Sequence, residues 1–376
     1  MTVVEARSVD AFEPDWVVPP GATMAGILAA RSLTREGFAE ALGESVETVH
    51  RLLLGLEVVD NGLAERLSGC LGSSSRFWMS REAQYRSDIE RLRQRETAAA
   101  RQMWLKQFPV REMTTLGWIR NLRFPDEVAQ ECLSFFGVPD VAAWQSRYAG
   151  AMSAAAFRMS GAARTDPGAV TAWLRWAELI ASRTPCAPWD MEAFKERLGK
   201  VRRLTWRKDP ATFLPLLRKL CAEVGVAVVV ARTPKGCPAS GATRFLSPSR
   251  AMMVLSFRYR SDDQFWFTFF HEAAHLLLHG SDALFLEGGS EMGSDEEREA
   301  NEFAGAMLVP RERSEEFLAL RPGKDAILRF ARQVGVAPGL IVGQLQHQGR
   351  VPMDDRLNNL KRRYAWDQIE ADRLIP

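Results

Sequence analysis

Three of the chain's five histidines lie within residues 269–279, and their spacing could hold a metal ion. His271 and His275 are four residues apart, and residues four apart share one face of an α-helix. Their imidazoles can therefore bind one ion together, while the neighbouring Glu272 can reach a water beside the metal rather than the metal itself. Two histidines and a glutamate in this H-E-x-x-H order are typical of zinc-dependent peptide hydrolysis, with the glutamate as general base.

A third ligand is expected from the next helix downstream, which the sequence predicts over residues 294–310. Ser294 is suited to cap this helix, and Glu297 could complete a capping box three residues later. Glu297 shares the inward side of the helix with Asn301. We therefore predict Glu297 as the third metal ligand and Asn301 as a hydrogen-bond partner of a ligand. Glu296 is the second choice, because the capping role competes for Glu297.

The helix that carries the histidines is predicted over residues 262–280, and apolar residues surround them on nearly every face. Such a helix is buried, and a dry site strengthens electrostatic interactions within it. A buried strand at 225–231 and a hairpin of strands at 243–247 and 252–257 are predicted before it. Either hairpin strand could hold an extended substrate chain at the edge of a small sheet.

The helix before this sheet, predicted within residues 210–224, contains Pro215. Proline is tolerated only in the first turn of a helix, so we expect this helix to start near Phe213. After the histidine helix, residues 281–293 form either a mobile loop over the cleft or a plain connection.

Hydrolysis also needs a hydrogen-bond donor for the oxyanion of the reacting peptide. Two candidates are His279, one turn beyond His275, and Arg258, between the last strand and the helix. A plain position at the helix end is the alternative for His279.

The two motifs can be read together, as His271-Glu272-x-x-His275 followed by Glu297-x-x-Ala300-Asn301-x-Phe303-Ala304-x-x-Met307-Leu308-x-Pro310. They resemble the ImmA/IrrE metallopeptidases, over about residues 205–345. The resemblance implies a minimal gluzincin, a zinc endopeptidase whose described targets are helix-turn-helix repressors. It also implies that His271, His275 and Glu297 are the zinc ligands and that Glu272 is the catalytic base.

An earlier part of the chain, residues 19–95, has the pattern of five short helices. Thr34 and Ser45 are suited to cap the second and third of them. The second helix, a short turn at Gly43 and Glu44, and the third helix have helix-turn-helix proportions. The predicted helices cover residues 23–30, 34–42, 45–53, 61–71 and 76–95.

This module contains the phrases Phe38-Ala-Glu-Ala-Leu-Gly, Ser45-x-x-Thr-Val-x-Arg-Leu-Leu-x-Gly55, Leu63-Ala-x-Arg-Leu and Phe77-Trp-Met-x-x-x-Ala-Gln-Tyr85. Together they resemble a HigA-type antitoxin of the XRE class. The resemblance implies that the third helix enters the major groove of an operator. Its candidate DNA-contacting residues are Ser45, Val46, Glu47, Thr48, His50 and Arg51.

The start of this third helix is a poor match to DNA, however. Glu44 and Glu47 would repel phosphates, and Val46 offers no hydrogen bond to a base edge. The module is therefore either an operator-binding domain or a helix-turn-helix that has lost DNA and serves in protein docking or dimerisation.

Composition narrows the class of protein. With 376 residues, 46% of them hydrophobic and 26% charged, two or more globular domains are expected. The net charge of +2 makes any nucleic-acid binding a local feature. Five cysteines without C-x-x-C spacing argue against a disulfide framework or a cysteine-held zinc, and favour the reducing cytoplasm. We find no signal peptide and no apolar run of about 18 residues, so no membrane span is expected.

The expected fold is mainly α-helical with a small β-sheet, of the α+β class. A flexible arm comes first, followed by the helix-turn-helix module, a helical connector, the metallopeptidase domain and a helical tail. Their predicted bounds are 1–18, 19–95, 96–200, 201–345 and 346–376. The tail carries Lys361, Arg362 and Arg363, for which a solvated face is expected rather than contact with DNA or a partner.

Two functions fit these observations. The first is a zinc endopeptidase fused to a DNA-binding-type domain, which relieves repression by cleaving a repressor or antitoxin-like regulator. The second is an antitoxin-like transcriptional regulator of a toxin–antitoxin or mobile-element operon, whose peptidase-like half senses or pairs with a toxin without proteolysis. The expected partners are Zn²⁺, an operator DNA, a protein substrate of the repressor or toxin–antitoxin kind, and a second copy bound through the helix-turn-helix domain.

Overall fold

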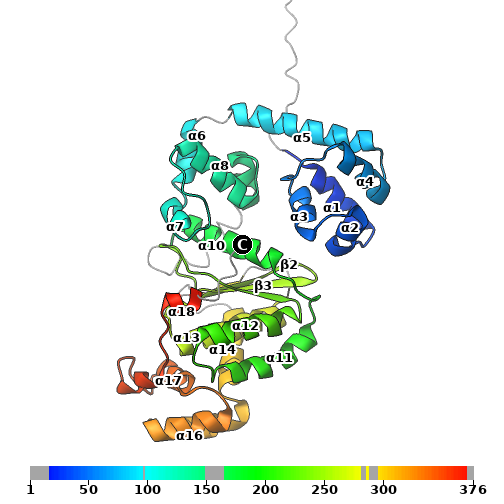
Figure 1. Ribbon diagram of the computed structural model, residues 1–376. Helices are drawn as coiled ribbons and strands as arrows, with labels where there is room; N and C mark the ends of the chain where they lie inside the picture. The colour runs from blue at the N-terminus through cyan, green and yellow to red at the C-terminus, as the bar shows by residue number, and fades with distance from the viewer. Residues whose placement is uncertain (1–16, 96–97, 149–164, 281–284, 288–294, 371–376) are drawn as a thin grey trace, which may run out of the picture. The chain divides into compact units, whose positions relative to one another are not determined.

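The computed structural model describes residues 17–95, 98–148, 165–280, 285–287 and 295–370 (Figure 1). By its internal contacts the chain divides into two units, one of Met1–Lys106 with Ile119–Gly150 and the other of Gln107–Trp118 with Ala151–Pro376. Most of the described residues are helical and one small sheet is present, which confirms the α+β class. The predicted arm, up to residue 16, and residues 149–164 of the predicted helical connector lie outside the described residues. The five predicted domain bounds stay a prediction.

The first unit begins with the five helices that the sequence predicts, α1 to α5. Thr34 and Ser45 cap α2 and α3 as expected, since their side chains accept hydrogen bonds from the backbone N–H groups of Gly37 and Thr48. Gly43 ends α2 in the left-handed conformation, with φ of 70°. The bounds are α1 Pro20–Ala30, α2 Arg35–Leu42, α3 Val46–Leu53, α4 Asn61–Leu71 and α5 Ser75–Arg95.

The rest of the first unit contains α6 (Ala98–Leu105), α8 (Pro125–Phe136) and a helix over 141–148. Trp104, Phe136 and Trp144 pack edge to face there, with ring centroids 5.7 to 6.3 Å apart. All three side chains are buried, so these aromatic residues form a core.

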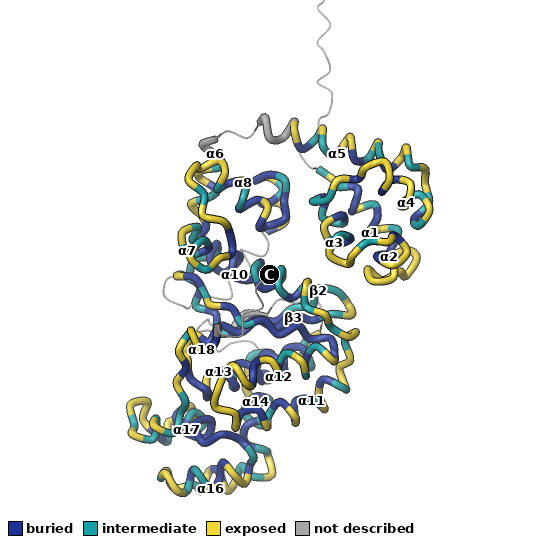
Figure 2. The backbone as a smooth tube through the Cα atoms, in the orientation of Figure 1, coloured by how far each residue is buried: buried dark blue, intermediate teal, exposed yellow. Residues whose placement is uncertain are grey.

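The second unit is built on a four-stranded sheet of order β1-β3-β2-β4. β1 runs parallel to β3, and β2 runs antiparallel to both β3 and β4. Helix α10 (Pro167–Arg183) covers one face, and α12 (Pro210–Ala222) and α13 (Asp262–Leu278) cover the other (Figure 1). Figure 2 shows β3 buried along nearly its whole length. The strands are β1 Val226–Val230, β2 Gly241–Ser247, β3 Arg250–Leu255 and β4 Phe285–Glu287.

The predicted hairpin is therefore present as β2 and β3, but the position of β3 within the sheet differs from the prediction. β3 lies between β1 and β2, so the prediction that the strand at 252–257 could receive a substrate chain at an edge is wrong. β2 is covered by β4 over Gly241, Ala242 and Thr243. The rest of β2, from Arg244 onward, has no described strand on that side.

Helix α12 (Pro210–Ala222) starts three residues earlier than predicted. Asp209 caps it by accepting from the N–H of Ala211, and Pro210 occupies the first position, which suits proline. Pro215 then lies inside the helix. It cannot donate to the carbonyl of Ala211 four residues earlier, but Ala211 is at the exposed start of the helix.

Helix α13 (Asp262–Leu278) carries the histidines and contacts β2, β3, α14 (Asp295–Leu308) and α17 (Pro338–His347). It is buried on nearly every face, as predicted, with Trp266, Phe269 and Phe270 fully buried. The other elements of this unit are α7 Val110–Thr115, α10 Pro167–Arg183, α11 Met191–Leu204, α15 Ser314–Ala319, α16 Lys324–Val334, α18 Trp366–Glu370 and two short 3₁₀ turns at Arg311–Arg313 and Arg356–Leu360.

The residues after the second 3₁₀ turn anchor the start of α13. Ser261 and Arg363 form an antiparallel bridge. The N–H of Asp262 donates to the Arg362 carbonyl and that of Arg362 donates to Asp262 Oδ1, both at 3.0 Å. Lys361 Nζ lies 2.5 Å from Asp263 Oδ2, and these two side chains are only 8% and 3% exposed.

The prediction of a solvated basic face at 361–363 is therefore wrong for Lys361 and Arg362. The Lys361 side chain is nearly buried and pairs with the buried Asp263 carboxylate. The Arg362 guanidinium donates to the carbonyls of Thr205 and Arg207. A local sequence pattern cannot reveal such pairings, because the partners lie 98 to 157 residues apart in the chain. No single helix among the described residues has the length and apolar composition to cross a membrane.

Candidate metal centre

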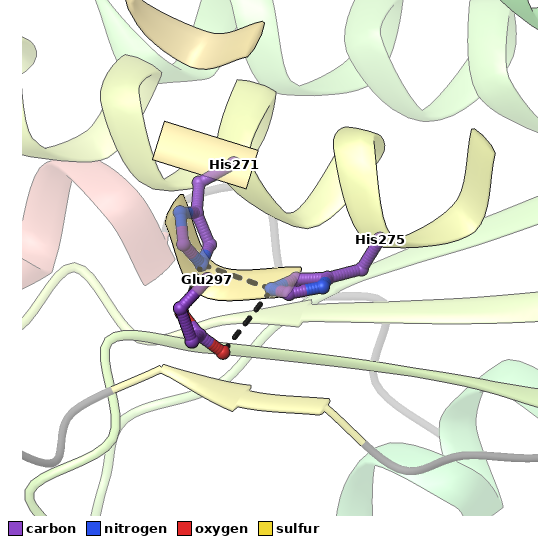
Figure 3. A group of neighbouring side chains, drawn as sticks. All are labelled: His271, His275 and Glu297. Carbon is purple, nitrogen blue, oxygen red and sulfur yellow. Dashed lines mark hydrogen bonds and ion pairs between the residues drawn. The ribbon is translucent and has the colours of Figure 1, made fainter. Parts of the chain in front are cut away.

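Helices α13 and α14 bring His271, His275 and Glu297 together (Figure 3). The Nε2 atoms of the two histidines are 3.0 Å apart. Glu297 Oε2 lies 3.1 Å from His271 Nε2, and its Oε1 lies 3.5 Å from His275 Nε2. The histidine side chains are almost wholly buried, whereas that of Glu297 is 29% exposed. The three ligand atoms thus share one small volume, and of the three side chains that of Glu297 is the most exposed to solvent.

This donor set fits a zinc ion. Zinc takes imidazole nitrogen and carboxylate oxygen at about 2.0–2.2 Å in tetrahedral geometry, which places neighbouring ligand atoms about 3.3–3.5 Å apart. The separations of 3.0, 3.1 and 3.5 Å are within a few tenths of an ångström of that spacing. Three protein ligands are also the number found in catalytic zinc sites. The ligand roles themselves stay a prediction.

Asn301 lies one turn beyond Glu297 on α14, and its Oδ1 is 3.1 Å from His271 Nδ1. With the amide oxygen at this position, His271 donates its Nδ1–H and keeps a lone pair on Nε2, which faces the other two ligand atoms. The structure therefore places Asn301 where the sequence suggests a partner for a ligand. Among the described residues the cluster takes Glu297 rather than Glu296, whose side chain is exposed. The predicted capping residue, Ser294, lies outside the described residues.

Glu272 is wholly buried on the side of α13 that faces β2. The Thr243 hydroxyl donates to Glu272 Oε2 at 2.9 Å and so fixes the plane of the carboxylate. Gly241 supplies the space, because a Cβ on that residue would lie 2.6 Å from Glu272 Oε1 and 2.8 Å from its Cγ. Neither Thr243 nor Gly241 stands out in the sequence. The one local signal is the hydroxyl residue Thr243 in the buried first half of the strand.

The two candidate oxyanion donors lie elsewhere. His279 Nδ1 is 2.9 Å from His275 Nδ1, on the opposite side of that ring from the other ligands, and His279 Nε2 is 3.3 Å from Glu299 Oε2. The Arg258 guanidinium donates to the Pro238 carbonyl and lies 5.3 Å from the centre of the Tyr259 ring. These contacts do not favour an oxyanion role for either residue, and that role stays a prediction.

The candidate DNA-contacting residues lie on α3 of the first unit. Its exposed face carries Val46, Glu47 and Arg51, and His50 and Thr48 are half-buried. Ser45 is occupied as the cap, with its Oγ 2.9 Å from the Thr48 hydroxyl. The Arg51 guanidinium donates to Glu57 Oε2 at 2.9 Å, and Glu44 pairs with Arg66 at 2.5 Å. The DNA role of these residues stays a prediction.

A small sheet backed by a helix with two histidines, completed by a glutamate from the next helix, defines a metallopeptidase-like domain. Residues 223–344 match the family model described as the IrrE N-terminal-like domain, a peptidase family. This match confirms the ImmA/IrrE part of the predicted resemblance for that segment and says nothing of the helix-turn-helix part. No curated protein matches the chain.

Proposed function

We propose that the second unit is a zinc-dependent endopeptidase that acts in transcriptional regulation by cleaving a repressor or antitoxin-like regulator. The observation that carries the proposal is the convergence of His271, His275 and Glu297, whose ligand atoms lie within 4.8 Å of one another. Beside them Glu272 is buried and oriented by Thr243. The similarity of residues 223–344 to a peptidase family supports the same reaction class.

When bound by these residues, a zinc ion supplies Lewis acidity, which polarises a peptide carbonyl and makes water a stronger acid. Glu272 accepts the proton that the attacking water gives up and later donates it to the leaving nitrogen. The Thr243 hydroxyl holds the carboxylate in place for both transfers. Burial of the two histidines and of Glu272 keeps bulk water away from their polar atoms, so these interactions are stronger than at a surface.

The class of substrate follows from two features of the chain. The family resemblance points to helix-turn-helix repressors, and the α2-turn-α3 arrangement of the first unit has the proportions of the same class of protein. We propose that the first unit recruits the regulator, either on an operator or through direct protein contact. The exposed Val46 and Glu47 on α3 favour direct contact, because an apolar side chain and a carboxylate suit a protein surface better than DNA phosphates.

The decisive experiment compares the wild-type chain with Glu272→Gln. Each protein is loaded with one equivalent of zinc and incubated with a panel of purified helix-turn-helix repressors from the same genome, and fragments are identified by mass spectrometry. We expect Glu272→Gln to bind zinc normally and to cleave at least about a hundredfold more slowly, since a general base contributes about 10²–10⁴-fold.

Glu302→Gln is the matched control, because it removes an equal charge from an exposed position on α14. It should cleave at the wild-type rate. Equal cleavage by wild type and Glu272→Gln would overturn the role of the glutamate. Equal gene regulation by the two proteins, with no cleavage by either, would favour the non-proteolytic antitoxin-like regulator.

A further inference from the structure

A chain of three polar side chains runs outward from the metal centre on the side away from Glu297. His275 Nδ1 lies 2.9 Å from His279 Nδ1, and His279 Nε2 lies 3.3 Å from Glu299 Oε2. The first two side chains are 1% and 5% exposed, whereas that of Glu299 is 50% exposed. We propose that Glu299 and His279 are positioning residues that set the proton arrangement of His275 and so tighten its hold on the metal. This inference rests on the proposed function, because it assigns a role toward the same ion.

The positions of the protons on His275 and His279 follow from the outer end of this chain of side chains, at Glu299. An ionised carboxylate only accepts hydrogen bonds, so the contact with Glu299 places a proton on His279 Nε2. In a neutral imidazole the other nitrogen then carries a lone pair, so His279 Nδ1 accepts. The adjoining nitrogen, His275 Nδ1, must therefore donate. That leaves the lone pair of His275 on Nε2, the atom that faces His271 and Glu297.

Helix α14, which carries Glu299, also sets the proton arrangement of His271 through Asn301. With both Nδ1 atoms protonated, two imidazole lone pairs and a carboxylate face one another across 3.0 to 3.5 Å. No member of this trio then donates a hydrogen bond to another, and their mutual repulsion is relieved by a cation. Outer hydrogen bonds of this kind typically strengthen metal binding by about 10–100-fold.

Simple attraction between Glu299 and the metal is a weaker explanation. The Glu299 side chain is half exposed, and exposed charges interact feebly through solvent. His279, by contrast, is buried between the carboxylate and the ligand, so its hydrogen bonds are shielded from water. The two explanations differ in their dependence on His279.

Zinc affinity, measured by competition with a chromogenic chelator on the full chain, distinguishes simple charge attraction from a hydrogen-bond relay that runs from Glu299 through His279 to His275. His279→Phe keeps a ring of similar size but removes both nitrogens, and we expect zinc binding about 10–100-fold weaker. His279→Asn keeps an acceptor where Nδ1 stands, and its affinity should stay within about threefold of wild type. Glu299→Ala should weaken binding severalfold, while Glu302→Ala, an equal charge change further along α14, should leave it unchanged.

The relay also predicts that Glu299 acts only through His279. Glu299→Ala should therefore have no additional effect in the His279→Asn background, which a double-mutant cycle on zinc affinity measures directly. An equal effect in both backgrounds would overturn the relay and leave a simple charge effect.

A second readout needs no variant and no metal. In the zinc-free wild-type chain labelled with ¹⁵N-histidine, long-range ¹H–¹⁵N spectra should show His275 protonated on Nδ1 and His279 on Nε2. A His275 ring protonated mainly on Nε2 would overturn the proposal, as would wild-type zinc affinity in folded His279→Phe. Failure of the wild-type chain to bind zinc would instead overturn the proposed function, and the spectra would still test the hydrogen-bond relay.

Discussion

Replacing Lys361 by Met tests how strongly residues 361–363 anchor the start of α13. The change keeps the length of the side chain and removes its charge. Asp263, whose side chain is 3% exposed, is then left as a buried carboxylate without the ammonium group that lies 2.5 Å away. Breaking a buried ion pair on one side costs about 3–5 kcal/mol, because the remaining charge is uncompensated.

The expected loss of stability in Lys361→Met can be measured by urea denaturation of the zinc-free chain. With an m-value of about 2–3 kcal/mol/M, a loss of about 3–5 kcal/mol lowers the urea midpoint of the second unit by about 1–2.5 M. Hydrogen exchange of peptides from α13 assigns the transition to that unit. The double change Asp263→Asn with Lys361→Met removes both charges and should recover much of the loss.

Arg298→Met is the matched control. Arg298 pairs with Asp295 at 3.2 Å, but these side chains are 59% and 90% exposed, and such surface pairs contribute about 0–1 kcal/mol. If Lys361→Met moves the urea midpoint no further than Arg298→Met, the reasoning about a buried anchor is refuted.

Two further predictions concern other residues that position α13. Gly241→Ala places a Cβ 2.6 Å from Glu272 Oε1, so we expect peptide hydrolysis to fall at least about tenfold through misplacement of the base, while chelator competition shows unchanged zinc affinity. Burial raises the pKa of Asp262 from the usual 3.8 to about 7. The folded state therefore holds this proton more tightly than the unfolded state, and ionisation destabilises the fold as pH rises from about 4 to about 7. Asp262→Asn keeps the acceptor and cannot ionise, so its stability relative to wild type should increase over that range in urea titrations; a constant difference would contradict the assignment.

Much of the local structure could be predicted because its causes are local. Thr34 and Ser45 cap their helices by bonding to backbone groups three residues away. The two histidines of H-E-x-x-H share a helix face for the same reason of short-range geometry. The start of α12 differs from the prediction because Asp209 and Pro210 together begin the helix, and Pro215 does not set its start.

The remaining features depend on residues distant in the chain. Nothing near Glu272 indicates that Thr243 donates to it across 29 positions, and nothing near Asp263 indicates Lys361. The edge of the sheet was also not predictable, because a three-residue strand such as β4 has too few positions for a pattern to emerge. The sequence could supply the candidate ligands, but the residues that hold them in place required the fold.

The bridge between Ser261 and Arg363 has a practical consequence for shortened forms of this chain. The segment similar to the peptidase family ends at residue 344, and a recombinant fragment cut at that limit would lack Lys361 and Arg362. Asp263 would then lose its counter-charge at the first turn of α13, and Asp262 would lose the backbone N–H that donates to its Oδ1. A fragment of this unit intended for crystallisation or screening should therefore extend at least through Tyr364, whose N–H also donates to the Arg260 carbonyl.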